Sequence, residues 1–262
     1  MEGLTTSRDL PPIRGFLPST LIDWPGRVAA EVFLGGCNFR CPFCHASHLV
    51  LNPSELEEIS LEAVLEHLRN QTGWVDGVVV SGGEPTLDGR LPTLIEALRE
   101  AGAAIKLDTN GARPEVLRAL IEAGMLEAAS MDLKAPLDER YSKAAGVEVD
   151  LTAIRESVAL LMSSALDVEF RTTVCPAFHT LDDVVDTARA IAGAAKYCLQ
   201  TFRPLNCIDP ALLEVGRYTE EEMRAMARAA GEFVRRCWVR GDAPAGMNPA
   251  ANRRTRRDEP GG

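Results

Sequence analysis

Apolar runs and amphipathic segments alternate along most of the chain. The apolar runs, such as RVAAEVFLGG at 27–36, are rich in Val, Leu and Ala and mostly lack strict alternation with polar residues. This pattern is typical of strands that are covered on both faces, as in parallel sheets. It predicts six strands, at 27–36, 76–83, 103–111, 127–134, 166–174 and 195–204.

The segments between the predicted strands have the period of amphipathic helices. After Ser60, a suitable N-cap, the apolar residues Leu61, Val64, Leu65 and Leu68 recur with helical spacing. Strand and helix therefore alternate, as they do in α/β proteins. Two further helix starts are indicated by capping-box patterns, Thr180 with Asp183 and Thr219 with Glu222.

Six strands, each followed by a helix, indicate one continuous α/β domain over residues 14–240. Because a closed barrel of the TIM type has eight strands, we expect a partial (β/α)6 TIM-type barrel. Residues 1–13 are predicted to be a lead-in. Residues 241–262 are predicted to be a disordered tail, because Pro, Gly and Asn surround its arginines.

Composition and charge narrow the classes of protein. The 262 residues include 28 basic and 38 acidic side chains, and the net charge of −10 argues against a nucleic-acid partner. No apolar run approaches the ~18 residues that a membrane span needs, and the N-terminus lacks a signal-peptide pattern. We therefore expect a cytoplasmic protein with no membrane partner.

Three of the seven cysteines follow directly on the first predicted strand. Cys37, Cys41 and Cys44 have the spacing C-x3-C-x2-C, and Gly35 and Gly36 permit the tight backbone path that brings such thiolates together. In an α/β sheet of this kind, ligands bind at the carboxyl ends of the strands, where this triplet lies. The other cysteines are scattered and are expected to be ordinary thiols: Cys175, Cys198, Cys207 and Cys237.

Three interpretations of the triplet remain open from its spacing alone. A structural zinc site would use the three thiolates and either His45 or His48 as a fourth ligand. Alternatively, the thiols are buried without a metal. A [4Fe–4S] cluster held by three thiolates would leave one iron without a protein ligand, which is the open position that a catalytic metal site needs.

The second predicted strand ends in SGGEPTL, residues 81–87. Gly82 and Gly83 allow the backbone to come close to a ligand, and Glu84 offers a carboxylate to a cationic amine. The alternative is a plain turn, stopped by Pro85, that happens to contain an acid.

The third and fourth predicted strands also end in polar residues. Asp108, in LDTNG, offers oxygen atoms to a ribose hydroxyl or a small cation, although an Asx turn or a helix cap would explain it too. Asp132 and Lys134, in MDLK, point to one face because strand side chains alternate. Such a buried charged pair is costly unless it binds a ligand or forms a structural ion pair.

The last two predicted strands add two candidates. Arg171 is placed to meet a ligand carboxylate, and Phe202 is placed to stack on adenine. A salt bridge for Arg171 and core packing for Phe202 explain them equally well. His179 is expected to be a loop histidine rather than a ligand.

Taken in chain order, these motifs resemble those of the radical S-adenosylmethionine (SAM) superfamily. Within it, the chain looks like the activating enzymes of glycyl radical enzymes, and most like the activating protein of anaerobic ribonucleoside-triphosphate reductase. The likeness extends from about residue 14 to residue 235. It is carried by GFLPSTLIDWPGRVAAEVFLGGCNFRCPFCH, VVVSGGEPTL, KLDTNG, MDLKAP and EFRTTV.

The resemblance implies a role for each motif. Cys37, Cys41 and Cys44 would hold a [4Fe–4S] cluster, and SAM would bind its fourth iron. Gly82, Gly83 and Glu84 would hold the methionine end of SAM, and Asp132 and Lys134 its ribose and carboxylate region. Phe43 would lie against adenine, and in relatives Asp108, Thr109 and Asp132 lie where a monovalent cation binds beside SAM.

The resemblance also implies the chemistry and the partners. An electron from the cluster would cleave SAM to methionine and a 5′-deoxyadenosyl radical, which would remove a hydrogen from a glycine Cα of a partner enzyme. That partner would be a glycyl radical enzyme, in particular anaerobic ribonucleoside-triphosphate reductase, and flavodoxin or ferredoxin would supply the electron. Two departures from the family pattern are Ala46, where an asparagine is common, and the absence of a histidine in TFRPLN.

Two other functions are weighed beside this one. A radical SAM enzyme could act on a small molecule instead of a protein. A non-enzymatic zinc-binding adaptor could use Cys37, Cys41, Cys44 and His48, but it would leave the polar residues at the other strand ends without a role.

Overall fold

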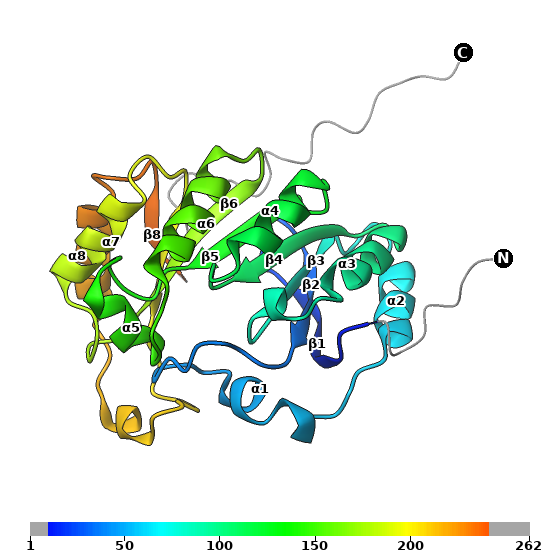
Figure 1. Ribbon diagram of the computed structural model, residues 1–262, viewed down its shortest axis with the longest axis horizontal. Coiled ribbons are helices and arrows are strands. Elements are labelled where there is room, and N and C mark those ends of the chain that lie inside the picture. The colour runs from blue at the N-terminus through cyan, green and yellow to red at the C-terminus, as the bar shows by residue number, and fades with distance from the viewer. Residues whose placement is uncertain (1–9, 241–262) are drawn as a thin grey trace, which may run out of the picture.

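The computed structural model describes residues 10–240, so the predicted tail and most of the predicted lead-in lie outside the described residues. Within this range the chain forms one sheet of eight strands in the order β1-β2-β3-β4-β5-β6-β7-β8. β1 and β2 are antiparallel, and each following pair of neighbouring strands, from β2 and β3 to β7 and β8, is parallel. In Figure 1, β8 lies on the left of the molecule, β5 and β6 lie near its middle, and β1 to β4 lie to their right. The architecture is the predicted partial barrel of an α/β domain.

The strands are β1 (Ile13–Thr20), β2 (Ala29–Leu34), β3 (Gly77–Gly82), β4 (Ala104–Thr109), β5 (Ala128–Asp132), β6 (Asp167–Val174), β7 (Tyr197–Thr201) and β8 (Cys237–Val239). The α-helices are α1 (Ser47–Leu51), α2 (Leu61–Asn70), α3 (Leu91–Glu100), α4 (Pro114–Glu122), α5 (Glu139–Ala145), α6 (Leu151–Ser163), α7 (Leu181–Ala190) and α8 (Glu220–Ala230). Three 3-10 helices are η2 (Pro53–Glu55), η3 (Pro85–Leu87) and η4 (Pro210–Glu214).

All six predicted strands are present, as β2 to β7. The structure adds β1, which opens with Ile13 at the end of the predicted lead-in, and the short strand β8. The predicted helix starts are also confirmed. Ser60 accepts a hydrogen bond from the Ala63 amide, and both Thr180 and Thr219 form complete capping boxes.

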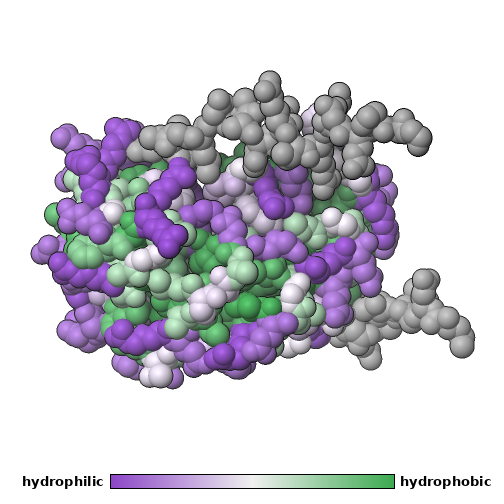
Figure 2. Space-filling view, turned by 90° about the horizontal axis from the view of Figure 1, so that it is seen from above, coloured by the Kyte–Doolittle hydropathy of each residue, from purple (hydrophilic) through white to green (hydrophobic). Residues whose placement is uncertain are grey.

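The two faces of the sheet have different chemistry. On the outer face, strand residues such as Val32 and Val80 pack with helix residues such as Leu94 in the main hydrophobic core. On the inner face, Trp24 packs with small residues of β2 and β5 and with Val79. Figure 2 shows hydrophobic residues gathered in the middle of one face of the molecule, with hydrophilic residues around them.

Several inward-facing positions of the barrel strands carry charged side chains. Most of these buried charges were not predicted from the sequence. Glu31, Lys106 and Glu169 are all at most 6% exposed, and each lies on a strand two positions from another inward residue. The Lys106 ammonium donates to the Asp23 carbonyl at 2.6 Å and to Asp108 Oδ1 at 2.8 Å. The barrel interior is therefore lined by ion pairs rather than by apolar side chains alone.

The barrel is open between its first and last strands, and one side chain bridges the gap. Nη1 of Arg240, which follows β8, donates to the Ile22 carbonyl at 3.0 Å and to Asp23 Oδ1 at 3.2 Å. Its Nη2 donates to Glu169 Oε1 at 3.2 Å. β1 and β8 thus meet through side-chain contacts and not through a strand ladder.

None of the helices between residues 10 and 240 has the length and apolar character that crossing a membrane requires.

Glu31 gives a first testable prediction about stability. Burial, followed by the charges of Asp23 and Asp108, raises the pKa of its carboxyl to about 8. Between pH 4.5 and 8 the folded chain therefore keeps a proton that the unfolded chain has lost, and the free energy of unfolding falls as the pH rises. We expect Glu31→Gln to reduce the loss of unfolding free energy between pH 6 and pH 8 by about 2 kcal/mol, measured by urea denaturation.

The matched control for this measurement is Glu100→Gln, at an exposed position at the end of α3. It removes the same charge from the surface and is expected to leave the pH dependence of unfolding unchanged. An identical pH dependence in wild type and Glu31→Gln would show that Glu31 is ionised in the folded protein.

Candidate active site

The three cysteines lie on the cluster loop, which we define as residues 35–46, between β2 and α1. Gly36 has a positive φ of 85°, and its amide donates to the Leu49 carbonyl at 2.7 Å. The Cys44 amide donates to the Cys41 carbonyl at 3.0 Å, which closes a turn between these two cysteines. This turn brings the second and third thiols to the same end of the barrel as the first.

All three thiols are free, and Cys41 is the one that is buried. Burial raises the pKa of Cys41 to about 12 and also raises that of Cys37, while Lys134 acts in the opposite direction on both. The negative forms of neighbouring cysteines also raise the pKa of Cys37 and Cys41, because these side chains lie close together. Three neighbouring thiols beside a fixed cation suit a soft metal centre that binds them as thiolates.

The two histidines of the zinc interpretation make other contacts or are exposed. Between residues 10 and 240, no three His, Cys, Asp or Glu side chains, the three thiols included, are arranged as ligands of a single metal ion. His45 Nε2 is instead 2.5 Å from the Arg203 carbonyl oxygen, and His48 is exposed on α1.

The GGE turn, residues 82–84, packs directly on the cluster loop through its backbone. The Gly83 amide donates to the Leu34 carbonyl at 2.9 Å, and the Glu84 amide donates to the Gly36 carbonyl at 2.8 Å. A Cβ atom on Gly83 would lie only 1.8 Å from the Gly36 oxygen, and one on Gly82 would lie 2.2 Å from the Leu34 oxygen. Both glycines are therefore required by the close approach of two backbones.

Glu84 connects the ends of β3 and β4. Its Oε1 accepts hydrogen bonds from the Thr86 amide at 3.1 Å, the Thr86 hydroxyl at 2.5 Å and the Thr109 hydroxyl at 2.8 Å. Its Oε2 accepts one, from the Asn110 amide at 2.6 Å. Burial raises the pKa of this carboxyl, and the hydrogen bonds partly offset that effect. Since Oε1 is saturated, Oε2 is the oxygen with capacity for a ligand amine.

Asp108, Asp132 and Lys134 are brought together with Arg171 in a single ion network. The Arg171 guanidinium donates to Asp108 Oδ2 at 2.7 Å and to Asp132 Oδ1 at 2.9 Å. Lys134 Nζ donates to Asp132 Oδ2 at 3.2 Å. Although burial alone would raise the pKa of Asp132, the charges of Arg171 and Lys134 hold it below the usual value.

This network changes the interpretation of Arg171. The residue is 6% exposed, and its guanidinium is paired with two carboxylates of the protein, so the salt-bridge alternative describes it. It also lies between Asp108 and Asp132, where a monovalent cation bound to both carboxylates would have to compete with it.

The two predicted adenine-binding rings are both buried. Phe43 is 5% exposed and packs against Phe178 and His179, with ring centroids 5.5 and 5.7 Å apart. Phe202 is fully buried, and its ring lies 5.8 Å from that of His45. Phe202 therefore packs against His45 of the cluster loop, and its ring has no exposed face.

Two residues of the site were missed or undervalued in the sequence. Asn110 Nδ2 donates to Asn38 Oδ1 at 2.8 Å and lies 3.8 Å from the Cys37 sulfur, so it connects β4 to the cluster loop. His179 is 1% exposed. Its Nδ1 accepts a hydrogen bond from the Cys175 amide at 3.0 Å. Nε2 therefore carries the ring proton, which it donates to the Lys134 carbonyl at 2.7 Å. The position of Asn110 in LDTNG was a usable signal, whereas nothing around His179 indicated its contacts.

A partial barrel with three neighbouring cysteines after β2 and a GGE turn after β3 defines a class of enzyme. The sequence profile of the radical SAM superfamily matches residues 32–191, which is more than half of the chain. The chain belongs to the radical SAM superfamily. Membership implies a [4Fe–4S] cluster and SAM, and the three thiols of the cluster loop are the residues that fit such a cluster.

Curated relatives make the comparison more specific. The chain is 29% identical over 239 residues to a protein of Methanocaldococcus jannaschii named "Putative glycyl-radical enzyme activating enzyme"; the match covers 85% of this chain and 92% of the relative. It is 27% identical over 229 residues to the 7-carboxy-7-deazaguanine synthase of Thermococcus kodakarensis, with 78% of this chain and 84% of that one covered.

Solved structures confirm the fold. SuiB of Streptococcus suis bound to S-adenosylmethionine superposes with a TM-score of 0.60 at 12% identity, covering 79% of this chain and 48% of SuiB. The coproporphyrinogen III oxidase of Escherichia coli, titled a radical SAM enzyme, gives 0.55 at 14% identity, covering 78% of this chain and 51% of the oxidase. The chain thus spans about half the length of these two proteins.

Proposed function

We propose that this radical SAM enzyme generates a glycyl radical on a partner protein, and that the partner is anaerobic ribonucleoside-triphosphate reductase. The observation that carries the proposal is the likeness to the M. jannaschii relative, since it extends over nearly the full length of both chains. The motifs that resemble the activating proteins of that reductase support the choice of partner.

Each part of the site has a role in this proposal. Cys37, Cys41 and Cys44 would hold the cluster, which when bound would supply the electron for reductive cleavage of SAM. The GGE turn offers backbone groups and Glu84 Oε2 to the methionine end of SAM. Asp132 and Lys134 would bind its ribose and carboxylate region, and Phe43 would contact the adenine.

A reconstitution experiment tests the partner. Anaerobically reconstituted protein is mixed with SAM, a flavodoxin or ferredoxin reducing system and anaerobic ribonucleoside-triphosphate reductase, and the sample is examined by electron paramagnetic resonance. We expect a glycyl radical doublet and one 5′-deoxyadenosine per radical formed. Deoxyadenosine release without any glycyl radical would exclude this partner while leaving SAM cleavage intact.

A small-molecule substrate is the second candidate function. The likeness to a 7-carboxy-7-deazaguanine synthase favours it, because that match also covers most of both chains. The two candidates are separated by adding metabolites alone to the reduced enzyme with SAM. Metabolite-dependent formation of deoxyadenosine, in the absence of any protein partner, would favour the small molecule.

A further inference from the structure

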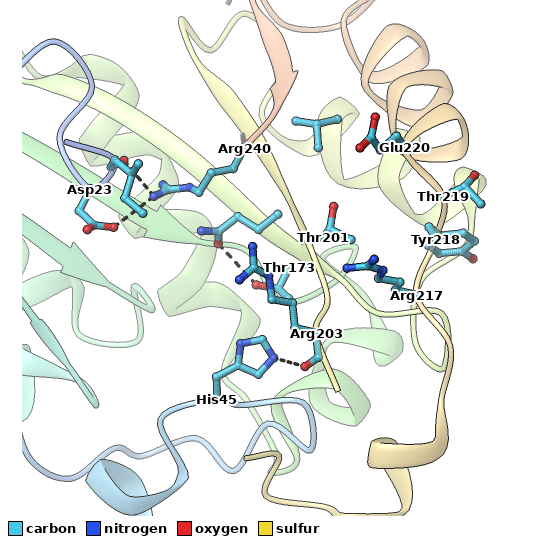
Figure 3. Close-up of a pocket in the computed structure, with 13 residues that line it drawn as sticks. Asp23, His45, Thr173, Thr201, Arg203, Arg217, Tyr218, Thr219, Glu220 and Arg240 are labelled. Atoms are coloured by element: carbon cyan, nitrogen blue, oxygen red, sulfur yellow. Dashed lines mark hydrogen bonds and ion pairs between the residues drawn. The ribbon is translucent and has the colours of Figure 1, made fainter. Parts of the chain in front are cut away.

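The cluster loop is attached to the rest of the barrel near both of its ends. Near its last residue, His45 Nε2 lies 2.5 Å from the Arg203 carbonyl oxygen, at the edge of the cavity in Figure 3. Near its start, the side chain of Asn110, which follows β4, contacts Asn38 and the sulfur of Cys37. The attachment through Asn110 therefore includes one of the three cysteine sulfurs.

The orientation of the Asn110 side chain is fixed by its neighbours. Its main-chain amide donates to Glu84 Oε2 at 2.6 Å, and its Oδ1 accepts a hydrogen bond from the Ala112 amide at 2.9 Å. Because a main-chain amide can only donate, this second contact identifies the side-chain atom that faces Ala112 as the oxygen. The NH2 group of Asn110 therefore faces the cluster loop, and the residue is only 5% exposed.

The sulfur of Cys37 accepts hydrogen bonds from two groups. Asn110 Nδ2 lies 3.8 Å from this sulfur and donates to Asn38 Oδ1 at 2.8 Å. An amide nitrogen carries two hydrogens, so both contacts can be made at once. The main-chain amide of Phe39 donates to the same sulfur at 3.3 Å. Cys37 is thus bonded to one main-chain donor and one side-chain donor.

The other two cysteines of the triplet differ from Cys37 in this respect. Between residues 10 and 240, no group donates a hydrogen bond to the sulfur of Cys41 or of Cys44. Since the Phe39 donor belongs to the main chain, Asn110 is the side chain through which a substitution can change the hydrogen bonding of the three sulfurs.

We propose that Asn110 raises the reduction potential of the bound cluster by donating a hydrogen bond to the sulfur of Cys37. Hydrogen bonds to the sulfurs are among the features that tune the potentials of iron–sulfur clusters. When one electron from a reductant enters the cluster, the thiolate sulfurs become more negative, and a donor beside one of them stabilises the reduced form. No bond forms or breaks in this step, and no proton is transferred. The inference rests on membership of the radical SAM superfamily and not on the identity of the partner.

The test is the substitution Asn110→Leu, which keeps the branching of the side chain and removes the donor. Anaerobically reconstituted wild type and variant are titrated with titanium(III) citrate in the absence of SAM, and the reduced cluster is followed by electron paramagnetic resonance. We expect the equilibrium constant for one-electron reduction to fall about fivefold, which lowers the potential by about 40 mV. Asn110→Ala, which adds no bulk to the site, is expected to shift the potential in the same direction.

The matched control is Asn38→Ala. It removes the other acceptor of the Asn110 NH2 group and leaves the contact with the Cys37 sulfur in place. If Asn110 acted only by connecting β4 to the cluster loop, both substitutions would have the same effect on the potential. We expect Asn38→Ala to leave the equilibrium constant for reduction within about twofold of the wild type.

The iron content of the same samples separates this role from a purely structural one. An unchanged potential in both Asn110 variants would overturn the proposal, and so would an equal shift in Asn38→Ala. Loss of iron in both Asn110 variants would also overturn it, because Asn110 would then be needed to hold the cluster loop. These measurements need neither SAM nor a partner, so their outcome is distinct from that of the proposed function, which is decided by the glycyl radical signal.

Discussion

Replacing Cys41 with alanine is expected to lower reductive SAM cleavage by at least about 1,000-fold, to the background of the assay. A [4Fe–4S] cluster that keeps one iron open has three protein ligands, and the loss of one leaves a second iron without a thiolate. The measurement is deoxyadenosine release under anaerobic conditions, together with the iron content and the brown absorbance of the reconstituted protein. Both the iron content and the rate are expected to fall together.

The control for this prediction is Cys207→Ala. Cys207 is partly exposed, lies outside the triplet and donates a weak hydrogen bond to the Leu205 carbonyl. Its loss is expected to leave iron content and SAM cleavage within about twofold of the wild type, as for an ordinary surface substitution. If Cys41→Ala retained normal iron and normal turnover, the assignment of the triplet would be wrong.

Gly83→Ala is expected to have the second large effect. The new methyl group would lie 1.8 Å from the Gly36 carbonyl oxygen, and the backbone cannot retreat without losing the Glu84 amide bond to that same oxygen. We expect a loss of more than about 3 kcal/mol in unfolding free energy, beyond the range of most single substitutions. SAM binding is expected to fall in parallel, because the turn no longer rests on the cluster loop.

Gly89→Ala is the matched control, since a Cβ at this position meets no atom within 4 Å. It is expected to change the unfolding free energy by less than about 0.5 kcal/mol. Urea denaturation measures the free energy of unfolding of both variants, and equilibrium dialysis with labelled SAM measures their affinity for SAM. Normal stability and SAM affinity in Gly83→Ala would contradict the backbone contact described here.

Much of the fold could be predicted from the sequence because the parallel strands are continuous apolar runs. β1 and β8 were missed for a physical reason. β1 contains Gly15 and Pro18 and is mostly partly or fully exposed, while β8 has only three residues. Whether such segments form strands depends on the neighbour with which they pair and not on their own composition.

The candidate site could be located from the sequence, but the partners of its side chains could not. The predicted residues lie at the carboxyl ends of the strands or on the loops that follow, except Arg171, which lies three residues before the end of β6. Motif positions follow from the order of strands and turns. The sequence did not indicate that Arg171 meets Asp108 and Asp132, or that Phe202 is covered by His45. These contacts depend on how neighbouring strands are twisted and staggered around the barrel.

The open seam of the barrel has a consequence for how a bulky substrate is admitted. The first and last strands share no main-chain ladder, and Arg240 connects them by contacts to Ile22, Asp23 and Glu169. A change of rotamer at this one arginine would remove its contacts across the seam without breaking any strand pairing, while Lys106 and the buried Trp24 would still hold the loop after β1. The seam is therefore closed by side-chain contacts, which exchange faster than a strand ladder opens.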